Sequence, residues 1–250
     1  MTMMGLVSNF FVHCVDDVPG DDASIRVWFT DLDQQKTETT QFSWLSTSEK
    51  VRAARLKSPL ARQRYVTSRV FTRRLLSDLT GILPENLEIL ADKCGKPYLN
   101  LPVAAHHLSS ESLLRFNISH SENAFCIATA LGSRVGVDIE VVNPNLDVLA
   151  ISDASLQPED IDRVQRSSLD ERSLVFYRIW TRREAFAKML GHGVSSDHVH
   201  AAPAPSWSLR SLEFTLSEKQ IAGSLAIAVP NNQFDDPFSR LPMKASPVDE

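Results

Sequence analysis

Hydrophobic and polar positions change their spacing several times along the chain, and each change predicts an element. Residues 24–30 alternate and are rich in β-branched and aromatic side chains, which predicts a strand. A helix is expected to begin at Ser46 or Thr47 and to be interrupted at Pro59. A second helix is expected over residues 61–79, where apolar residues recur at rough helical spacing.

The rest of the chain predicts more strands and two further helices. The predicted strands cover residues 87–90, 113–119, 124–131, 135–142, 207–216 and 222–229. Residues 156–170 are expected to form a short acidic helix, and residues 171–190 form the clearest helical pattern, which Gly191 ends. A turn near Gly132 separates two strands and is the predicted boundary between two parts of the chain.

The length and composition suit a globular protein. The chain has 250 residues, of which 43% are hydrophobic, enough for one large domain or two closely packed small lobes. No apolar stretch approaches the ~20 residues of a membrane span. The first basic residue is Arg26, so no secretory signal is expected.

The cysteines indicate a reducing compartment. Cys14, Cys94 and Cys126 are odd in number and far apart, so they form neither a disulfide framework nor a metal-ligand spacing. We therefore expect a cytoplasmic protein.

Charge is unevenly distributed along the chain. The net charge is −5, yet the segment 50–74 contains nine basic residues and no acidic one. Such a segment favours an anionic partner, which could be nucleic acid, a phosphate-rich cofactor or an acidic protein. The alternative is a solvated helix face without a binding role.

Two carboxylates alternate with apolar residues in the segment VDIEV. In a strand, Asp138 and Glu140 point to the same side, with their Cα atoms roughly 6–7 Å apart. Their oxygens could converge on one small cation, and oxygen ligands suit Mg²⁺. The alternative is the exposed face of an edge strand.

The long helix 171–190 carries a third acid. Trp180, Glu184 and Lys188 follow one another at intervals of four and share one face. Glu184 could take a proton or join the metal, while Lys188 neutralises a phosphate. The alternative is a surface ion pair that contributes a few tenths of a kcal/mol.

Four motifs resemble, in order, the Sfp-type 4'-phosphopantetheinyl transferase family. They are GKPYL at 95–99, FNISHS at 116–121, GVDIE at 136–140 and WTRREAFAKMLGHG at 180–193. The resemblance implies an α+β fold of two similar lobes with pseudo-twofold symmetry. It also implies an N-terminal lobe over 1–132 on the adenosine side of coenzyme A, and a C-terminal lobe over 133–230 with the catalytic acids. Residues 231–250 are expected to be a flexible tail.

The resemblance also implies site residues. The metal-centred acids are Asp138, Glu140 and Glu184. The residues expected to contact the diphosphate of coenzyme A are Lys188 and His120, and those expected to help hold the cofactor are Lys96 and Ser119. Lys50 would reach the 3'-phosphate, with Arg55 as a competing candidate. One departure is Arg183 before Glu184, where the family usually has lysine.

The activity implied by the resemblance is a Mg²⁺-dependent transfer, with Mn²⁺ as an alternative ion. Coenzyme A is the co-substrate, and the acceptor is a serine of an acyl or peptidyl carrier protein of fatty acid, polyketide or nonribosomal peptide biosynthesis. Glu184 would act as the base, with Lys188 and His120 stabilising charge. We expect a monomer with no nucleic-acid or membrane partner. The alternatives are a non-catalytic coenzyme A or carrier-binding protein on the same fold, and a nucleic-acid-binding protein using the basic segment.

Overall fold

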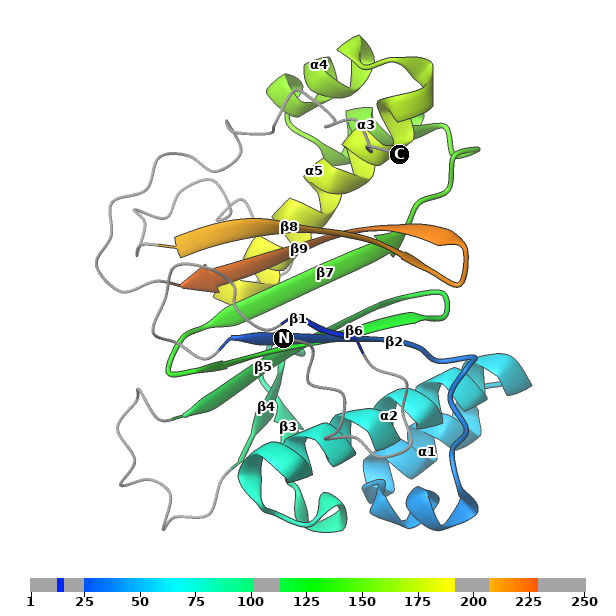
Figure 1. Cartoon of the computed structure of the whole chain (residues 1–250), viewed down its shortest axis with the longest axis vertical. Coiled ribbons are helices and arrows are strands. Elements are labelled where there is room, and N and C mark those ends of the chain that lie inside the picture. The colour runs from blue at the N-terminus through cyan, green and yellow to red at the C-terminus, as the bar shows by residue number, and fades with distance from the viewer. Residues whose placement is uncertain (1–12, 16–24, 101–112, 192–206, 229–250) are drawn as a thin grey trace.

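The structure, a computed structural model, describes residues 13–15, 25–100, 113–191 and 207–228. Two antiparallel sheets lie at its centre, with helices on their outer sides (Figure 1). This mixture confirms the predicted α+β class. The predicted pseudo-twofold symmetry stays a prediction, and the predicted tail 231–250 lies outside the described residues.

The first sheet is built from the N-terminal half of the chain and has the order β1-β2-β6-β5. Its strands are β1 (His13–Val15), β2 (Arg26–Asp31), β5 (Leu114–Ser121) and β6 (Ala124–Leu131). A separate hairpin consists of β3 (Ile89–Ala91) and β4 (Pro97–Leu99). The helical elements of this half are η1 (Thr39–Trp44), α1 (Thr47–Arg55), α2 (Pro59–Thr80) and η2 (Pro84–Asn86).

Local capping explains where α1 and α2 begin and end. The Ser46 hydroxyl accepts from the backbone N–H of Glu49, whose carboxylate accepts from the Ser46 N–H in return. Pro59 occupies the first turn of α2 behind the cap Ser58, so α2 begins two residues earlier than predicted. Gly81 ends α2 in the left-handed region, at φ 72°.

The second sheet has the order β7-β9-β8 and comes from the C-terminal half. Its strands are β7 (Val135–Val141), β8 (Trp207–Leu216) and β9 (Lys219–Ala228). The helices are α3 (Val148–Ser155), α4 (Pro158–Arg166) and α5 (Leu169–Leu190). The prediction of one helix over 156–170 is wrong at its end, because Ser168 is the N-cap of α5 and α4 stops at Arg166. The sequence pattern also missed α3.

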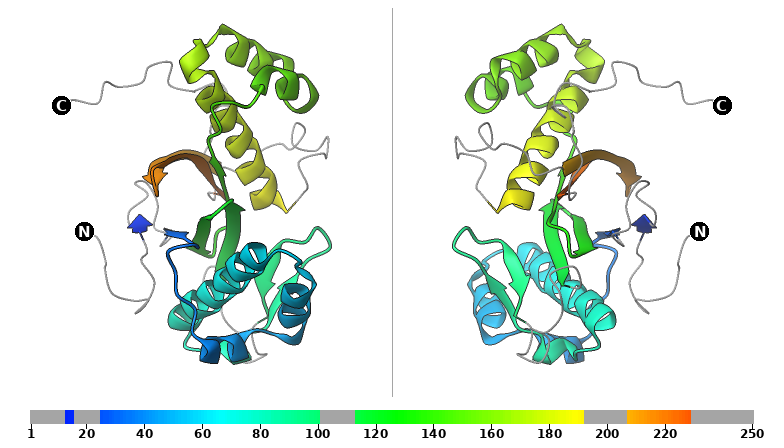
Figure 2. Two further views of the ribbon diagram at one scale, coloured as in Figure 1. Left: turned by 90° about the vertical axis from the view of Figure 1, so that its right-hand side faces the viewer. Right: turned by 90° about the vertical axis from the view of Figure 1, so that its left-hand side faces the viewer.

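The elements stack as helix, sheet, sheet and helix. Helix α2 packs Val70 and Phe71 against Phe125 on the outer face of the first sheet. The inner faces of both sheets share one core, in which Cys126 of β6 and Ile139 of β7 take part. Helix α5 covers the outer face of the second sheet, opposite α1 and α2 in both views of Figure 2. This arrangement leaves the edges of the two sheets beside each other.

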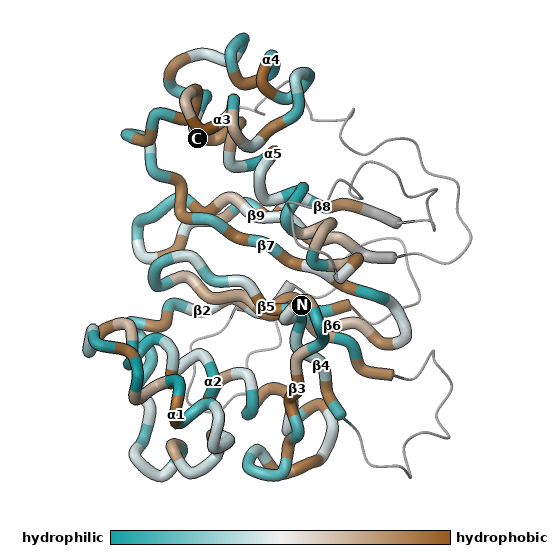
Figure 3. The backbone as a smooth tube through the Cα atoms, turned by 180° about the vertical axis from the view of Figure 1, so that it is seen from behind, coloured by the Kyte–Doolittle hydropathy of each residue, from teal (hydrophilic) through white to brown (hydrophobic). Residues whose placement is uncertain are grey.

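Strands β5 and β7 each lie at one end of their sheet's strand order, and they contact each other directly. Along β7 hydrophobic and hydrophilic positions alternate, as predicted (Figure 3). The hydrophobic positions enter the shared core, and Gly136, Asp138 and Glu140 face the other way, towards α5. In the described part of the chain, no helix has the length and apolarity needed to cross a membrane.

Candidate active site

A glycine brings α5 directly onto β7. A Cβ atom at position 136 would overlap the carbonyl oxygen of Ala185 and the backbone nitrogen of Met189. Because Gly136 lacks that atom, the backbone of the helix can rest on the strand. The close approach places Glu184 and Lys188 of α5 over the acidic face of β7.

Asp138 lies at the centre of this face and is 4% exposed. Its Oδ1 accepts hydrogen bonds from Lys188 Nζ at 2.6 Å and from Ser119 Oγ at 2.8 Å. Its Oδ2 is buried and has no hydrogen-bond partner among the described residues. Burial raises the pKa of Asp138, while the positive charge of Lys188 opposes that rise. A buried carboxylate oxygen without a partner is costly unless a cation or a donor reaches it.

Glu140 follows two residues later and is half-buried. Its Oε2 accepts a hydrogen bond from Ser121 Oγ at 2.6 Å. Burial raises the pKa of Glu140, and the negative charge of Asp138 adds to that rise. The two carboxylates on one face were predicted from alternation, and the structure has them there.

Glu184 is the third acid and is half-buried on α5. Burial, and then the negative charges of Asp138 and Glu140, raise its pKa to about 7, while Lys188 opposes the shift. The carboxylate makes no hydrogen bond or ion pair with the residues that the structure describes. A carboxylate that titrates near neutral pH can accept a proton during a reaction and release it afterwards.

Two nitrogen-bearing side chains, Lys188 and His120, border the acids. The Lys188 ammonium donates to Ser119 Oγ at 3.1 Å as well as to Asp138. Partial burial, and then the positive charges of Arg69 and Lys188, lower the pKa of His120. The imidazole, at the end of β5, is therefore neutral at neutral pH and able to donate a hydrogen bond to an anion.

Two arginines that the sequence analysis did not single out lie near His120. The guanidinium groups of Arg52 and Arg69 stack on the Tyr65 ring, at 5.4 and 5.6 Å from its centroid. The Arg69 Nε is buried without a hydrogen bond to the described residues. Both charges act on His120. The spacing of Tyr65 and Arg69, four residues apart on one helix, is the signal that could have indicated this pair.

The predicted basic residues Lys50 and Arg55 do not share the position of Arg52 and Arg69 on the Tyr65 ring. The Lys50 ammonium donates to the carbonyl of Ser43 at 3.3 Å and lies 5.8 Å from the centre of the Phe42 ring. Arg55 is exposed and has no hydrogen bond or ion pair within the described residues. The structure does not bring either residue to the acids.

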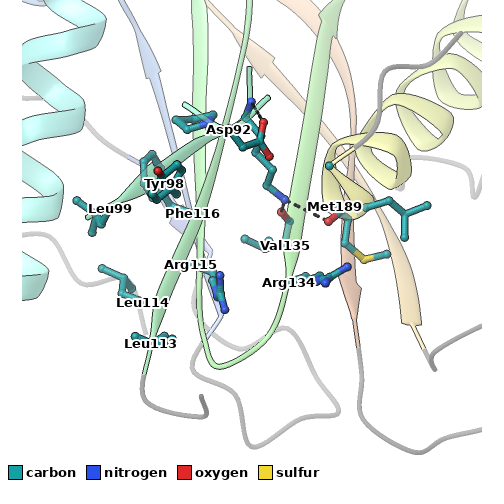
Figure 4. Close-up of a pocket in the computed structure, with 14 residues that line it drawn as sticks. Asp92, Tyr98, Leu99, Leu113, Leu114, Arg115, Phe116, Arg134, Val135 and Met189 are labelled. Carbon is teal, nitrogen blue, oxygen red and sulfur yellow. Dashed lines mark hydrogen bonds between the residues drawn. The ribbon is translucent and has the colours of Figure 1, made fainter. Parts of the chain in front are cut away.

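Lys96 ties the β3–β4 hairpin to the end of α5. Its ammonium donates to the carbonyls of Val135 and Met189, each at 3.1 Å (Figure 4). It also donates to the carbonyl of Lys188 at 2.6 Å. A cation on the last carbonyls of a helix stabilises its C-terminus. Burial, and then the charge of Arg134, lower the pKa of Lys96 to about 8. These three bonds use all the hydrogens of the ammonium, beside a cavity of about 350 Å³.

Arg183, the departure from the family pattern, turns away from the acids. Its Nη1 lies 3.5 Å from Oδ2 of Asp160 on α4, and its side chain is 8% exposed. The residue therefore joins α4 to α5.

The acids, Lys188, Ser119 and His120 thus come together at the meeting point of β5, β7 and α5. Among the described residues, no three His, Cys, Asp or Glu side chains converge closely enough to hold a metal ion. The donor chemistry nevertheless suits a hard cation, because Asp138 Oδ2 is a carboxylate oxygen without a partner in the described residues. Glu184 is a second carboxylate, near enough for the charge of Asp138 to raise its pKa.

Two family profiles match adjoining parts of the chain. Residues 33–132 match the profile described as 4'-phosphopantetheinyl transferase, N-terminal, and residues 134–229 match that of the 4'-phosphopantetheinyl transferase superfamily. The second match contains Asp138, Glu140, Glu184 and Lys188, and the first contains Ser119 and His120.

Curated relatives carry the same description. The 4'-phosphopantetheinyl transferase HetI of Nostoc sp. is 27% identical over 200 residues, which are 75% of this chain and 82% of HetI. AcpT of Escherichia coli K12 is 31% identical over 119 residues, 48% of this chain and 55% of AcpT. A 4'-phosphopantetheinyl transferase of Bacillus subtilis is 29% identical over 131 residues, 52% of this chain and 50% of that relative. With both halves matched, the chain belongs to the 4'-phosphopantetheinyl transferase superfamily.

Proposed function

We propose that the chain transfers the 4'-phosphopantetheine group of coenzyme A to a serine of an apo acyl or peptidyl carrier protein and releases adenosine 3',5'-bisphosphate. Family membership and the names of the relatives support this reaction. For the site, the proposal rests on the surroundings of the two carboxylate oxygens of Asp138. Lys188 binds one oxygen of this carboxylate, and the other is buried without a partner in the described residues.

The residues that would hold a metal ion are Asp138, Glu140 and Glu184. Their oxygens are the ligands that Mg²⁺ prefers, and Mn²⁺ accepts the same donors. A bound ion of this kind would offset negative charge on the diphosphate and on the leaving group. Asp138 is the strongest candidate because its free oxygen is already desolvated.

The chain's own residues would handle the proton and the phosphate charge. Glu184 takes the proton of the carrier serine as the serine oxygen bonds to the β-phosphorus of coenzyme A. The bond from that phosphorus to the bisphosphoadenosine oxygen then breaks. Lys188 and His120 would donate to the diphosphate oxygens as charge develops there.

The binding of coenzyme A involves a larger set of residues. We keep Lys50, Arg55, Lys96 and Ser119 in the proposal, and we add Arg52 and Arg69 as candidates for the 3'-phosphate. Arg52 and Arg69 are supported by their shared position on Tyr65 and by their charge at His120. A guanidinium group is well suited to bind phosphate.

The setting of the reaction is part of the same proposal. Residues 1–132 would form the lobe that binds adenosine and residues 133–230 the lobe that holds the acids. The protein would act as a cytoplasmic monomer, without a nucleic-acid or membrane partner. Cys94 is exposed and unpaired, which is compatible with a reducing compartment.

The test is an assay of the product. The full chain is incubated with coenzyme A, Mg²⁺ and several apo carrier proteins of the fatty acid, polyketide and nonribosomal peptide types. Mass spectrometry should find a phosphopantetheine adduct on the carrier serine, and chelation by EDTA should abolish it. Absence of an adduct on every carrier would overturn the proposal.

A matched variant separates this enzyme from a non-catalytic coenzyme A binder on the same fold. Glu184→Gln preserves the shape of the side chain but cannot accept a proton as a carboxylate does. We expect transfer to fall by roughly 10²–10⁴-fold while the variant still binds coenzyme A and keeps its circular dichroism spectrum. Full activity in this variant would show that another group is the base.

A further inference from the structure

The edges of the two sheets are joined by side chains where a ladder of backbone hydrogen bonds would otherwise be found. Asn117 Oδ1 accepts from the N–H of Val137 at 2.9 Å. Further along β5, Ser119 Oγ accepts from Ile139 N–H at 3.2 Å, and Ser121 Oγ accepts from Val141 N–H at 3.1 Å. We call these three contacts the seam. They satisfy buried backbone donors of an edge strand that would otherwise lack partners.

The two hydroxyl groups of the seam have a second contact. Each donates to the carboxylate of the residue that precedes its N–H partner: Ser119 to Asp138 at 2.8 Å and Ser121 to Glu140 at 2.6 Å. A single serine oxygen can do both, because it has one hydrogen and two lone pairs. The third contact differs, since Gly136 precedes Val137 and offers no side chain.

Asp138 and Glu140 differ in how far each depends on its serine for hydrogen bonding. Asp138 is held by Lys188 as well as by Ser119. Glu140 has a longer side chain, and within the described residues its only hydrogen bond is to Ser121. Removing the Ser121 hydroxyl would therefore leave the Glu140 carboxylate free to rotate among several rotamers.

We propose that Ser121 is a positioning residue of the transfer reaction, which holds the Glu140 carboxylate in place towards the metal and ties its orientation to the contact between the two sheets. This inference rests on the proposed function. Hydrogen bonds to a ligating carboxylate fix its direction, and losing one weakens metal binding. The hydrogen bond is short and charge-assisted, so its geometry is specific.

The same oxygen couples the site to the seam. If β5 shifted along β7, the N–H of Val141 and the carboxylate of Glu140 would both lose Ser121 together. A one-residue shift would also place the apolar Ile118 or the ring of His120 where a hydroxyl is needed, because alternate residues of β5 face opposite ways. Orientation of the acids thus depends on the register of the two sheets.

The test measures Mn²⁺ binding to the full chain in the presence of coenzyme A by electron paramagnetic resonance, a readout that does not need turnover. We expect Ser121→Ala to weaken Mn²⁺ binding by roughly tenfold and to raise the Mg²⁺ concentration for half-maximal transfer to the same degree. Ser121→Thr keeps the hydroxyl and should stay within about threefold of the original chain.

Two controls test whether the loss of the Ser121 hydroxyl changes Mn²⁺ affinity through Glu140. Asn117→Ala removes a contact of the seam that has no carboxylate, so it should lower thermal stability but leave Mn²⁺ affinity unchanged. In a Glu140→Gln background, Ser121→Ala should have little further effect on Mn²⁺ affinity, because the carboxylate that it positions is gone.

Unchanged Mn²⁺ affinity in Ser121→Ala would overturn the inference, as would an equally large effect in the Glu140→Gln background. Either result, obtained with a chain that modifies carrier proteins, would leave the proposed function standing. Failure of the original chain to modify any carrier would instead overturn the proposed function.

Discussion

The ammonium nitrogen of Lys188 lies 2.6 Å from Oδ1 of Asp138, which places a cation of α5 on an acid of β7. The carboxylate side chain is 5% exposed and the lysine side chain 29%. The pair therefore lies at the border of the interior, where a lone charge would be costly. Together with the close approach at Gly136, it connects the helix and the strand of the candidate site.

Removing the lysine charge should destabilise the protein. In Lys188→Met, Asp138 loses its cation and keeps, among the described residues, only the side-chain hydrogen bond from Ser119, so we expect the free energy of unfolding to fall by about 1–3 kcal/mol. Excess Mg²⁺ with coenzyme A should restore part of that loss if a cation binds the carboxylate. Urea denaturation with and without Mg²⁺ measures both effects, and equal losses in the two conditions would contradict a metal at Asp138.

Ionisation of Glu184 should make stability depend on pH. Its pKa is about 7 in the folded chain and near 4.5 when unfolded, so the folded state binds the proton more tightly. The resulting stabilisation is fully present below pH 4.5 and is lost as the pH rises through 7. Glu184→Gln removes this term, and its stability relative to the original chain should increase between pH 5 and pH 8. Denaturation of both chains in EDTA at pH 5 and pH 8 tests this trend. The same difference in the free energy of unfolding at the two pH values would contradict it.

Arg52 and Arg69 should contribute to coenzyme A affinity through the 3'-phosphate. We expect Arg69→Met to weaken binding by roughly tenfold, because a charge-assisted contact to phosphate is lost. Lys50→Met should also weaken binding, but less, by about threefold, since the Lys50 ammonium already bonds the carbonyl of Ser43. Calorimetry with coenzyme A and with dephospho-coenzyme A distinguishes the subsites: the Arg69 effect should vanish with the ligand that lacks the 3'-phosphate.

Gly136 should not tolerate a side chain. In Gly136→Ala the new Cβ would meet the backbone of Ala185 and Met189, which can move only with the whole of α5. We expect a loss of stability of roughly 1–3 kcal/mol or more, and a large loss of transfer as α5 separates from β7. Gly81→Ala is the matched control: its Cβ meets nothing within 4 Å, and only its positive φ costs about 1–2 kcal/mol. Its activity should be retained at temperatures where it is folded.

Local sequence determined much of the architecture. Strict alternation in β7 put Asp138 and Glu140 on one face, and caps at Ser46 and Gly81 marked the ends of α1 and α2. These features depend on neighbours within a few residues, which a sequence pattern records directly. Where the pattern was ambiguous, as in the acidic stretch before Ser168, the predicted helix ran too far and α3 was missed.

The basic segment shows the limit of such patterns. Its charge was evident from the sequence, but nine cations on two helices and the connection between them cannot all face one ligand, and spacing did not say which of them do. In the fold, Lys50 bonds the carbonyl of Ser43, and Arg52 and Arg69 lie over the Tyr65 ring. That choice depends on how α1 and α2 pack, which no local period specifies.

Sequence alone therefore determined the acids, their strand and helix, and the resemblance to a family of transferases. Only the tertiary structure decided that Lys188 reaches Asp138, that Lys96 binds the end of α5, and that Ser121 holds Glu140. The physical reason is distance along the chain. These pairs are separated by 50, 92 and 19 residues, and their geometry is set by the packing of whole elements on Gly136 and across the seam.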